Sequence, residues 1–215
     1  RAERDPGADL KGALSPRVRK SHPAITSPAT VGILMNAIDN YPGTLVVRSA
    51  LKLMALTFCR SGEIRNAEWK EFDLADSLWR IPAERMKMSR DHLVPLSRQA
   101  MAVLERLRQY SGNDQYVFPS YNTETKSMGR ETLRSALRRL GFEKDEMCPH
   151  GFSSMASTLL NEMNFNADWI ERQLAHVPRE HIRGIYNRAE YLPERRKMMQ
   201  AWADYLDELR AKSVG

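Results

Sequence analysis

The chain has 215 residues, 42% of them apolar, which is enough to bury one complete hydrophobic core. A formal net charge of +6 and a pI near 9.4 favour an anionic partner, although a merely basic soluble domain has the same balance. The only cysteines, Cys59 and Cys148, argue against a disulfide framework and favour a reducing, cytoplasmic compartment. No apolar run approaches the roughly 20 residues of a membrane span, and no metal-binding motif occurs, so we expect neither a membrane partner nor a metal site.

Residues 1–27 are rich in Pro, Gly, Arg and Lys and lack a sustained hydrophobic period. They are typical of a linker that follows a missing upstream domain, and equally of a disordered chain end. The first residue is arginine rather than methionine, so we expect that an upstream part has been removed. Residues 28–215 are predicted to form one domain, which begins with a helix opened by Ser27 and Pro28.

A second, mostly buried helix is predicted from Leu45 to Phe58, and a charged residue, Arg60, follows it closely. A guanidinium beside a buried helix is costly unless it is paired or faces a functional cleft. Glu63 lies three residues later and offers a structural salt bridge. A place in a cleft is the alternative for Arg60.

Short alternating runs between Trp69 and Leu96 predict a small antiparallel sheet. The connection between the last two runs carries Arg85, Lys87 and Arg90. A basic hairpin tip of this kind is usually a solvated surface, and a functional lysine is the alternative. The rest of the domain has mostly helical periodicity, so the predicted fold class is mainly α with a small antiparallel β-sheet (α+β).

A short extended piece at residues 116–119 and a polar loop at residues 120–127 are predicted between two amphipathic helices, over residues 98–110 and 129–140. In the second, Arg130, Arg134 and Arg138 recur every four residues along about 12 Å of helix. Arginines in this register can follow a phosphate backbone, although the row could also be a solvated face. Because few acids balance the row, we favour binding to nucleic acid.

The segment from residue 149 to residue 188 has the most chemically active side chains. A helix is predicted to open at its start, with His150 and Ser153 on the polar side near an N-terminus that favours phosphate. A second helix, capped by Asn166, is predicted to end at His176.

Tyr186 follows His176 by ten residues and lies among arginines. A phenol with two imidazoles and several guanidiniums is typical of covalent attack on a phosphodiester, with fixed donors stabilising the charge on phosphorus. Tyr191 is the rival nucleophile.

These segments resemble the catalytic domain of the tyrosine recombinases, the phage-integrase family, and in particular integrases of prophages and genomic islands. The family segments read HGFR, LLNE, QLAH and YNRA, and this chain has HGFS, LLNE, QLAH and YNRA in the same order. The family's Arg-x-Gly-Glu motif matches at Arg60 and Glu63, and the segment ERMKM…HLVPLS aligns Lys87. The resemblance runs from about Ser27 to Leu209 and implies the tyrosine recombinase catalytic-domain fold.

The resemblance implies a site-specific DNA recombinase in which Tyr186 attacks a scissile phosphate, giving a 3′-phosphotyrosine and a free 5′-hydroxyl. Arg60 and His176 would hydrogen-bond the non-bridging oxygens. His150 would assist proton transfer at the tyrosine, and Lys87 would protonate the leaving oxygen. The bond energy stays in the protein–DNA ester, so no cofactor or metal is required.

The implied partners are double-stranded DNA attachment sites, a homotetramer assembled on DNA and a DNA-bending accessory protein. The implied place of action is the bacterial nucleoid. The missing upstream domain would then be a DNA-binding domain that carries much of the sequence recognition.

Ser153 departs from the family, which has its second catalytic arginine at this position. Losing one preorganised donor typically costs about 100- to 1,000-fold in rate. Three explanations are open: a weakened or inactive natural integrase, an engineered substitution, or replacement by a nearby arginine. Two other functions are therefore weighed, a DNA-binding module that has lost cleavage and a nicking enzyme of the topoisomerase IB type.

A regular amphipathic helix is predicted over residues 193–211, with Trp202 on its apolar stripe. It either packs on its own core or, as the resemblance implies, against a neighbouring protomer. The exposure of Trp202 separates these two possibilities.

Overall fold

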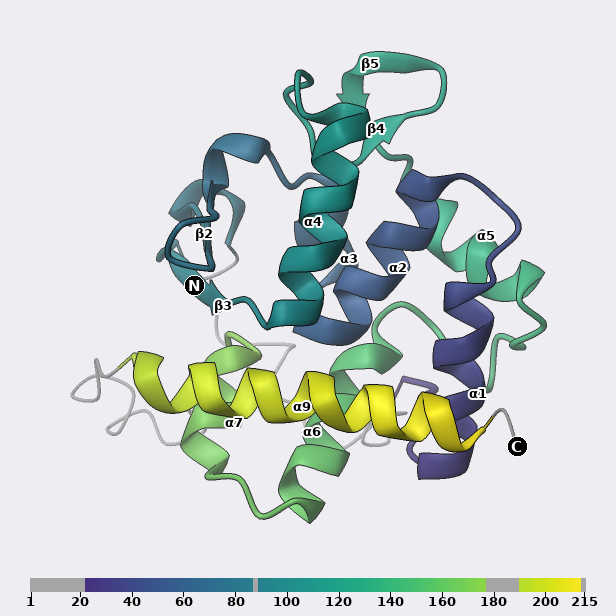
Figure 1. Ribbon diagram of the computed structural model, residues 1–215, viewed down its shortest axis with the longest axis vertical. Helices are drawn as coiled ribbons and strands as arrows, with labels where there is room; N and C mark the ends of the chain where they lie inside the picture. The colour runs from purple at the N-terminus through teal and green to yellow at the C-terminus, as the bar shows by residue number, and fades with distance from the viewer. Residues whose placement is uncertain (1–21, 87–88, 177–189, 214–215) are drawn as a thin grey trace, which may run out of the picture.

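The computed structural model describes residues 22–86, 89–176 and 190–213 (Figure 1). It is mainly helical with a small antiparallel sheet, as predicted, and it has a second, two-stranded antiparallel sheet as well. The helices are α1 Pro28–Asp39, α2 Leu45–Thr57, α3 Ser61–Arg65, α4 Arg98–Ser111, α5 Thr132–Arg139, α6 Gly151–Glu162, α7 Ala167–Gln173 and α9 Leu192–Lys212.

Helix α2 lies at the centre of the core, since nine of its 13 residues are buried. It begins at an N-cap, Thr44, whose hydroxyl accepts a hydrogen bond from the Val47 amide at 3.3 Å. It ends where Phe58 adopts a left-handed backbone with φ 45°, which turns the chain sharply towards Arg60. The buried helix therefore fixes the place at which the first candidate catalytic residue leaves the core.

The three-stranded sheet consists of β1 Phe72–Asp73, β2 Leu78–Ile81 and β3 His92–Pro95, in the order β1-β2-β3. Phe72 and Trp79 are register partners, and their rings stack with centroids 5.0 Å apart. Short 3-10 turns precede β1 (Trp69–Glu71) and follow β2 (Ala83–Arg85). This is the small antiparallel sheet that the alternating runs predict.

A second hairpin, β4 Pro119–Ser120 with β5 Thr123–Ser127, lies where the sequence indicates a short extended piece and a polar loop. The expectation of a loop was wrong for residues 123–127. Polar residues on both faces hide the alternation that usually identifies a strand, whereas the β-branched Thr123 and Thr125 suit one.

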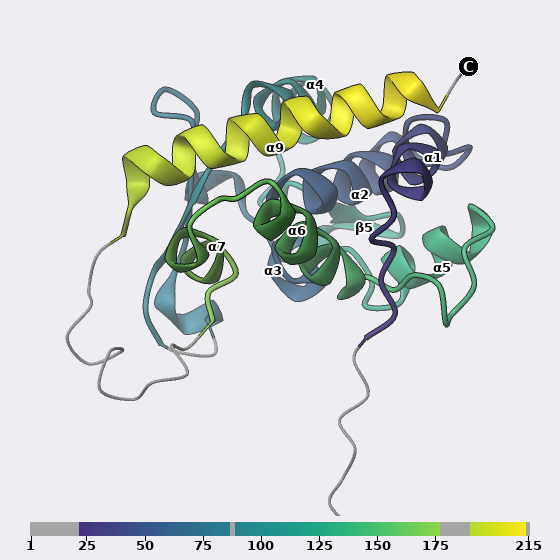
Figure 2. The same ribbon diagram turned by 90° about the horizontal axis from the view of Figure 1, so that it is seen from below.

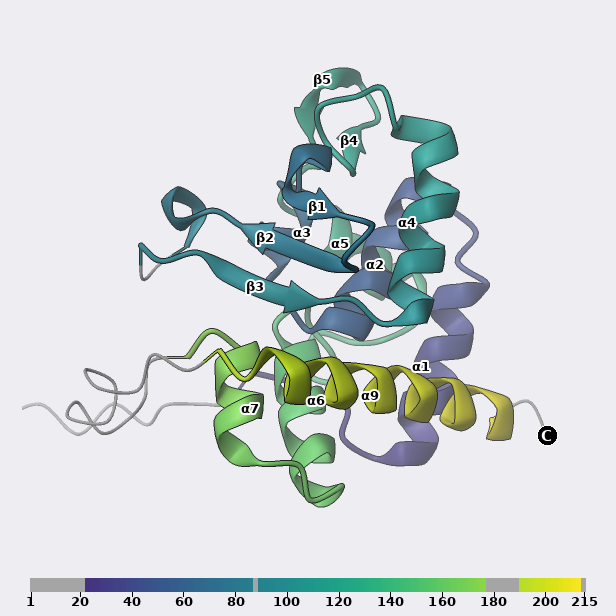
Figure 3. The same cartoon turned by 60° about the vertical axis from the view of Figure 1, so that its left-hand side comes forward.

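Helix α9 crosses the molecule beside α6 and α7 and reaches α1 at its far end (Figures 1 and 2). In the view of Figure 3 the three-stranded sheet lies above α9, and most of α6 and α7 lies below it. Trp202 is fully buried, and its indole N–H donates to the Ala55 carbonyl at 2.9 Å. Helix α9 therefore packs on the domain's own core, and this decides between the two possibilities for Trp202.

Residues 22–27 pack against the domain although they belong to the predicted linker. Ile25 is buried in the core, and the Pro23 carbonyl oxygen lies so close to Gly151 that no side chain fits there. The ring of His22 meets the ring of His150 edge-on, with centroids 4.4 Å apart. The chain that enters the domain thus contacts the first turn of α6, where two candidate site residues lie.

Candidate active site

Arg60 leaves the core at the start of α3 and is held by the turn that follows it. Its Nη1 pairs with Glu63 Oε1 at 2.8 Å, and the other carboxylate oxygen accepts from the Arg60 amide at 2.8 Å. Its Nη2 lies 3.4 Å from the carbonyl oxygens of Leu174 and Ala175. The salt bridge expected from the sequence is present, and it orients a guanidinium that remains 34% exposed.

A cavity of about 550 Å³ opens beside Arg60. Its lining is strongly basic and comprises Arg60, Ser61, Gly62, Glu63, Arg65, Asn66, Arg85, Arg130 and His150. Four arginines and a histidine thus face a single carboxylate, which Arg60 already engages. A hollow with this surplus of positive charge suits a phosphate group.

His150 is the N-cap residue of α6, one residue before the helix begins at Gly151. Burial lowers the pKa of His150 from its usual 6.5, and the nearby charges of His22, Arg60 and His176 lower it further. The imidazole is therefore neutral at pH 7 and can accept a proton. Arg60 and His150 thus line one cavity, whereas His176 is not among its lining residues.

His176 follows α7, which ends at Gln173 rather than at the predicted residue 176. The predicted cap is confirmed, because the Asn166 side chain accepts from the Asp168 amide at 2.8 Å. The His176 Nδ1 lies 2.9 Å from Glu171 Oε2, and the side chain is 43% exposed. This contact fixes the ring and directs Nε2 as the nitrogen that can meet a substrate.

A buried polar network joins α7, α9, β3 and the end of α2. Arg195 has no exposed surface; its Nε and Nη2 donate to Gln173 Oε1 at 3.2 and 2.6 Å, and Nη2 donates to the Leu93 carbonyl at 2.5 Å. The side-chain amide of Gln173 donates to the Thr57 carbonyl at 3.2 Å. The backbone carbonyl of Gln173 accepts a hydrogen bond from His92 Nε2 at 3.1 Å. The network therefore ties the chain before Arg60 to the chain before His176. Sequence reasoning missed it, because a glutamine and an arginine on amphipathic helices have no distinctive spacing.

Ser153 lies elsewhere than predicted. It is buried rather than on a polar face, and its hydroxyl donates to the Phe58 carbonyl at 2.9 Å. The left-handed turn at Phe58 exposes this carbonyl to α6, so the serine satisfies an acceptor at the helix end. Ser153 does not line the basic cavity.

The predicted row of three arginines divides into three environments. Arg130 precedes α5 and lines the cavity with Arg60. Arg134 is exposed and pairs with Glu131 at 3.0 Å. Arg138 turns back on its own loop, donating to the carbonyls of residues 142 and 147. The structure thus contradicts a continuous row, because Arg138 donates to carbonyls of the loop that follows α5 instead of facing outward.

The domain matches the family model described as "Phage integrase family" over residues 26–192. This covers most of the chain. The chain belongs to the phage integrase family. The sequence-based recognition of a tyrosine recombinase of the prophage-integrase type is confirmed.

Curated relatives align over almost the whole chain of this integrase-family domain. The integrase of Enterobacteria phage P4 is 44% identical over 225 residues, covering 98% of this chain and 51% of the relative. The prophage integrase IntZ of Escherichia coli (strain K12) is 40% identical and is covered over 51% of its length. The chain thus spans about half the length of these relatives.

Solved structures share the fold at low sequence identity. An integrase from mycobacterium phage Brujita has a TM-score of 0.66 at 15% identity, over 91% of this chain and 66% of that one. A lambda integrase tetramer bound to a Holliday junction has a TM-score of 0.56 at 17% identity, over 81% of this chain and 53% of that one. The predicted tyrosine recombinase catalytic-domain fold is confirmed.

Two predicted site residues, Lys87 and Tyr186, lie outside the described residues. The rival tyrosine, Tyr191, is the N-cap residue of α9 and has a left-handed backbone with φ 47°. Arg65 and Arg85 line the cavity but were not singled out from the sequence. Their neighbours were, since Arg65 follows the Arg-x-Gly-Glu motif and Arg85 precedes Lys87.

Within residues 22–86, 89–176 and 190–213, no group of three or more His, Cys, Asp or Glu side chains is placed to hold a metal ion. No helix in that part of the chain combines the length and apolar character needed to cross a membrane.

Proposed function

We propose that this chain is the catalytic domain of a site-specific DNA recombinase that cleaves and rejoins DNA through a 3′-phosphotyrosine intermediate. Members of the tyrosine recombinase family are DNA-cleaving and rejoining enzymes. The observation that carries the proposal for this chain is the basic cavity that Arg60 and His150 both line.

In the proposed reaction, the Tyr186 oxygen forms a bond to phosphorus and the bond from phosphorus to the 5′-oxygen breaks. Neutral His150 assists removal of the tyrosine proton, and Lys87 gives a proton to the leaving 5′-oxygen. The charge that develops on the non-bridging oxygens is stabilised by Arg60 and His176. A 5′-hydroxyl from a second strand then attacks the phosphotyrosine and restores the tyrosine.

Preorganisation supports the role proposed for Arg60. Glu63 holds the guanidinium from one side, and the network through Gln173 fixes the chain segments before Arg60 and before His176. Donors that are held before the substrate arrives need no reorganisation during the reaction. The proposed site therefore has the rigidity that transition-state stabilisation requires.

The test is a nicked suicide DNA substrate carrying an attachment site, with an SDS-resistant protein–DNA adduct as the readout. We expect the adduct to form with the unchanged chain and to disappear in Tyr186→Phe, which keeps the ring but removes the nucleophile. Tyr191→Phe is the matched control and should retain the adduct. An adduct that survives Tyr186→Phe and disappears in Tyr191→Phe would reassign the nucleophile.

A second candidate function is a DNA-binding module of the same fold that no longer cleaves. The observation that favours it is Ser153, whose hydroxyl is engaged by the Phe58 carbonyl and which brings no charge to the cavity. This module would bind attachment-site DNA without forming an adduct, whereas an adduct that appears only with Ser153→Arg would show a recombinase that Ser153 has impaired. Binding without any adduct in either protein supports the non-cleaving module.

We also propose that the domain acts on double-stranded attachment sites as a homotetramer, with a DNA-bending accessory protein. One structural neighbour is a lambda integrase tetramer bound to a Holliday junction, and another is a Tn1549 integrase in complex with transposon right-end DNA. Analytical ultracentrifugation of the chain with and without its DNA site tests the assembly. A single protomer per site at saturation would contradict it.

A further inference from the structure

The arginines of the basic cavity differ in what already holds them. Arg60 pairs with Glu63. Arg85 pairs with Glu71 and donates to the Glu63 carbonyl at 2.7 Å. Two of the four guanidiniums are therefore engaged by carboxylates before any ligand enters.

The other two cavity arginines have no carboxylate partner among the described residues. Arg65 has one long contact, from Nη1 to the Met128 carbonyl at 3.4 Å. Arg130 is exposed, and its side chain has no hydrogen bond or ion pair with any other described residue. Arg130 is therefore the cavity cation with the most freedom to bind an anion.

The surroundings of Arg130 leave that freedom intact. The nearest acid in sequence, Glu131, is paired with Arg134 at 3.0 Å and so is drawn away from the cavity. Gly129 precedes Arg130, and the chain there follows the buried Met128 before α5 begins at Thr132. An arginine on this turn can place its planar fork towards the cavity without giving up a bond in the fold.

We propose that Arg130 is a catalytic residue that supplies a second guanidinium to the phosphate bound by Arg60. This inference rests on the proposed function. Phosphoryl transfer spreads negative charge over the non-bridging oxygens, and one bidentate arginine engages only part of it. Ser153 brings no cation to the cavity, and Arg130 brings one from a different segment of the chain.

A double-mutant cycle on residues 130 and 153 tests the assignment. The rate of adduct formation is measured in a single turnover at saturating suicide DNA for the unchanged chain, Arg130→Ala, Ser153→Arg and the double variant. We expect Arg130→Ala to slow the reaction by about 100-fold, the effect of removing one preorganised donor. In the Ser153→Arg background the same change should slow it by less than about tenfold, because the introduced guanidinium takes over the contact.

Matched controls separate catalysis from simple binding. Arg139→Ala removes an exposed arginine at the C-terminal end of α5 that does not line the cavity, and it should leave the saturated rate unchanged. Arg130→Lys should retain part of the rate, because it keeps the charge but loses the planar fork. A residue that only holds the DNA backbone would weaken the Kd and lower the salt dependence by about one ion, without slowing the saturated reaction.

The outcomes distinguish this inference from the proposed function. If Arg130→Ala leaves the rate of adduct formation unchanged, or lowers it by the same factor in both residue-153 backgrounds, Arg130 does not replace a second guanidinium. The recombinase assignment still stands in that case. An adduct that forms only with Ser153→Arg would also show that Arg130 does not replace the second guanidinium, and it would leave the recombinase assignment intact. If neither residue-153 form gives a Tyr186-dependent adduct, the proposed function fails and the inference fails with it.

Discussion

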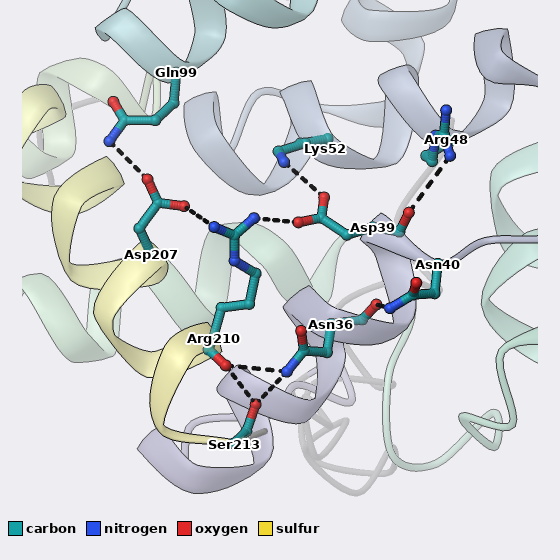
Figure 4. A network of polar contacts seen from close by, with 9 residues as sticks. All are labelled: Asn36, Asp39, Asn40, Arg48, Lys52, Gln99, Asp207, Arg210 and Ser213. Atoms are coloured by element: carbon teal, nitrogen blue, oxygen red, sulfur yellow. Dashed lines mark hydrogen bonds and ion pairs between the residues drawn. The ribbon is translucent and has the colours of Figure 1, made fainter. Parts of the chain in front are cut away.

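Arginine side chains have different surroundings in two regions of the molecule, the polar cluster between α1 and α9 and the cavity beside Arg60. In the cluster, Arg210 pairs with Asp39 and lies 3.4 Å from Asp207, while Lys52 Nζ lies 2.6 Å from Asp39 (Figure 4). The cavity, by contrast, is lined by four arginines and a single carboxylate, that of Glu63. Acidic side chains therefore balance the basic ones where α1 and α9 pack together. The cavity, where an anion is expected to bind, keeps a surplus of positive charge.

The α1–α9 cluster also shows how close packing and polar contacts act together. The Asn36 amide donates to the Arg210 carbonyl at 3.0 Å and to the Ser213 hydroxyl at 2.6 Å (Figure 4). A side chain at Gly32 would collide with the Leu209 carbonyl, so the two helices touch backbone to backbone.

The largest effect on stability is expected at the buried network. Arg195→Met leaves Gln173 Oε1 and the Leu93 carbonyl buried without their donor, and this should lower the free energy of unfolding by about 3–5 kcal/mol. Urea denaturation followed by circular dichroism measures the change. Arg196→Met is the control, because Arg196 bonds Asp76 at an exposed site; an equal loss there would contradict the distinction.

At the cavity we expect the reverse, a large effect on the rate of adduct formation and a small effect on stability. Arg60→Ala removes a preorganised donor and should slow adduct formation by about 100- to 1,000-fold. The fold should be little affected, since Glu63 keeps its bond from the residue 60 amide at 2.8 Å. Single-turnover kinetics and a thermal melt of the same variant measure the two quantities. A melt lowered as far as that of Arg195→Met would make Arg60 structural.

A pH dependence is expected from His92, a buried residue of β3 whose Nε2 lies 3.1 Å from the Gln173 backbone carbonyl. Burial, followed by the charges of Arg195 and Arg172, lowers the pKa of His92 from 6.5 to about 3. The unfolded chain therefore protonates His92 at a higher pH than the folded chain does. The contribution of neutral His92 to stability is complete above pH 6.5 and is lost as the pH falls towards 3. At pH 5 the loss relative to pH 7 should be about 2 kcal/mol.

Unfolding measured from pH 7.5 to pH 4.5 checks this dependence. His92→Gln keeps a donor for the Gln173 carbonyl but cannot be protonated, so the slope of stability against pH should fall by about one proton. An unchanged slope would show that His92 is not the group that titrates.

The smallest effect is expected at Asp39. Burial raises the pKa of this carboxyl, but hydrogen bonds from Lys52 and Arg210 and their charges outweigh it and hold the pKa below 3.8. Asp39→Asn should cost about 1 kcal/mol at pH 7, as for a partly exposed ion pair. Because the native pKa is lowered, this contribution is present above pH 4 and is lost as the pH falls through the native value. The difference in stability between wild type and variant should therefore shrink as the pH falls below 4, and a constant difference would contradict the pairing.

Much of the candidate site could be predicted from sequence because its residues lie in motifs. Arg60 and Glu63 are three residues apart, and their salt bridge forms within one turn of chain. The Asn166 cap is also local. Ser153 was misplaced because its partner, the Phe58 carbonyl, is 95 residues away and is exposed only by a left-handed turn.

The sequence alone determined the family, the mainly helical fold and the order of the motifs, because these depend on local periodicity and residue identity. Only the tertiary structure decided that Trp202 is buried in the core of this domain and that Arg138 donates to loop carbonyls. It also decided that Arg130 lines the same cavity as Arg60. The physical reason is distance along the chain. A side chain's charge is written in the sequence, but whether an acid, a carbonyl or an empty cavity faces it depends on segments brought together by packing.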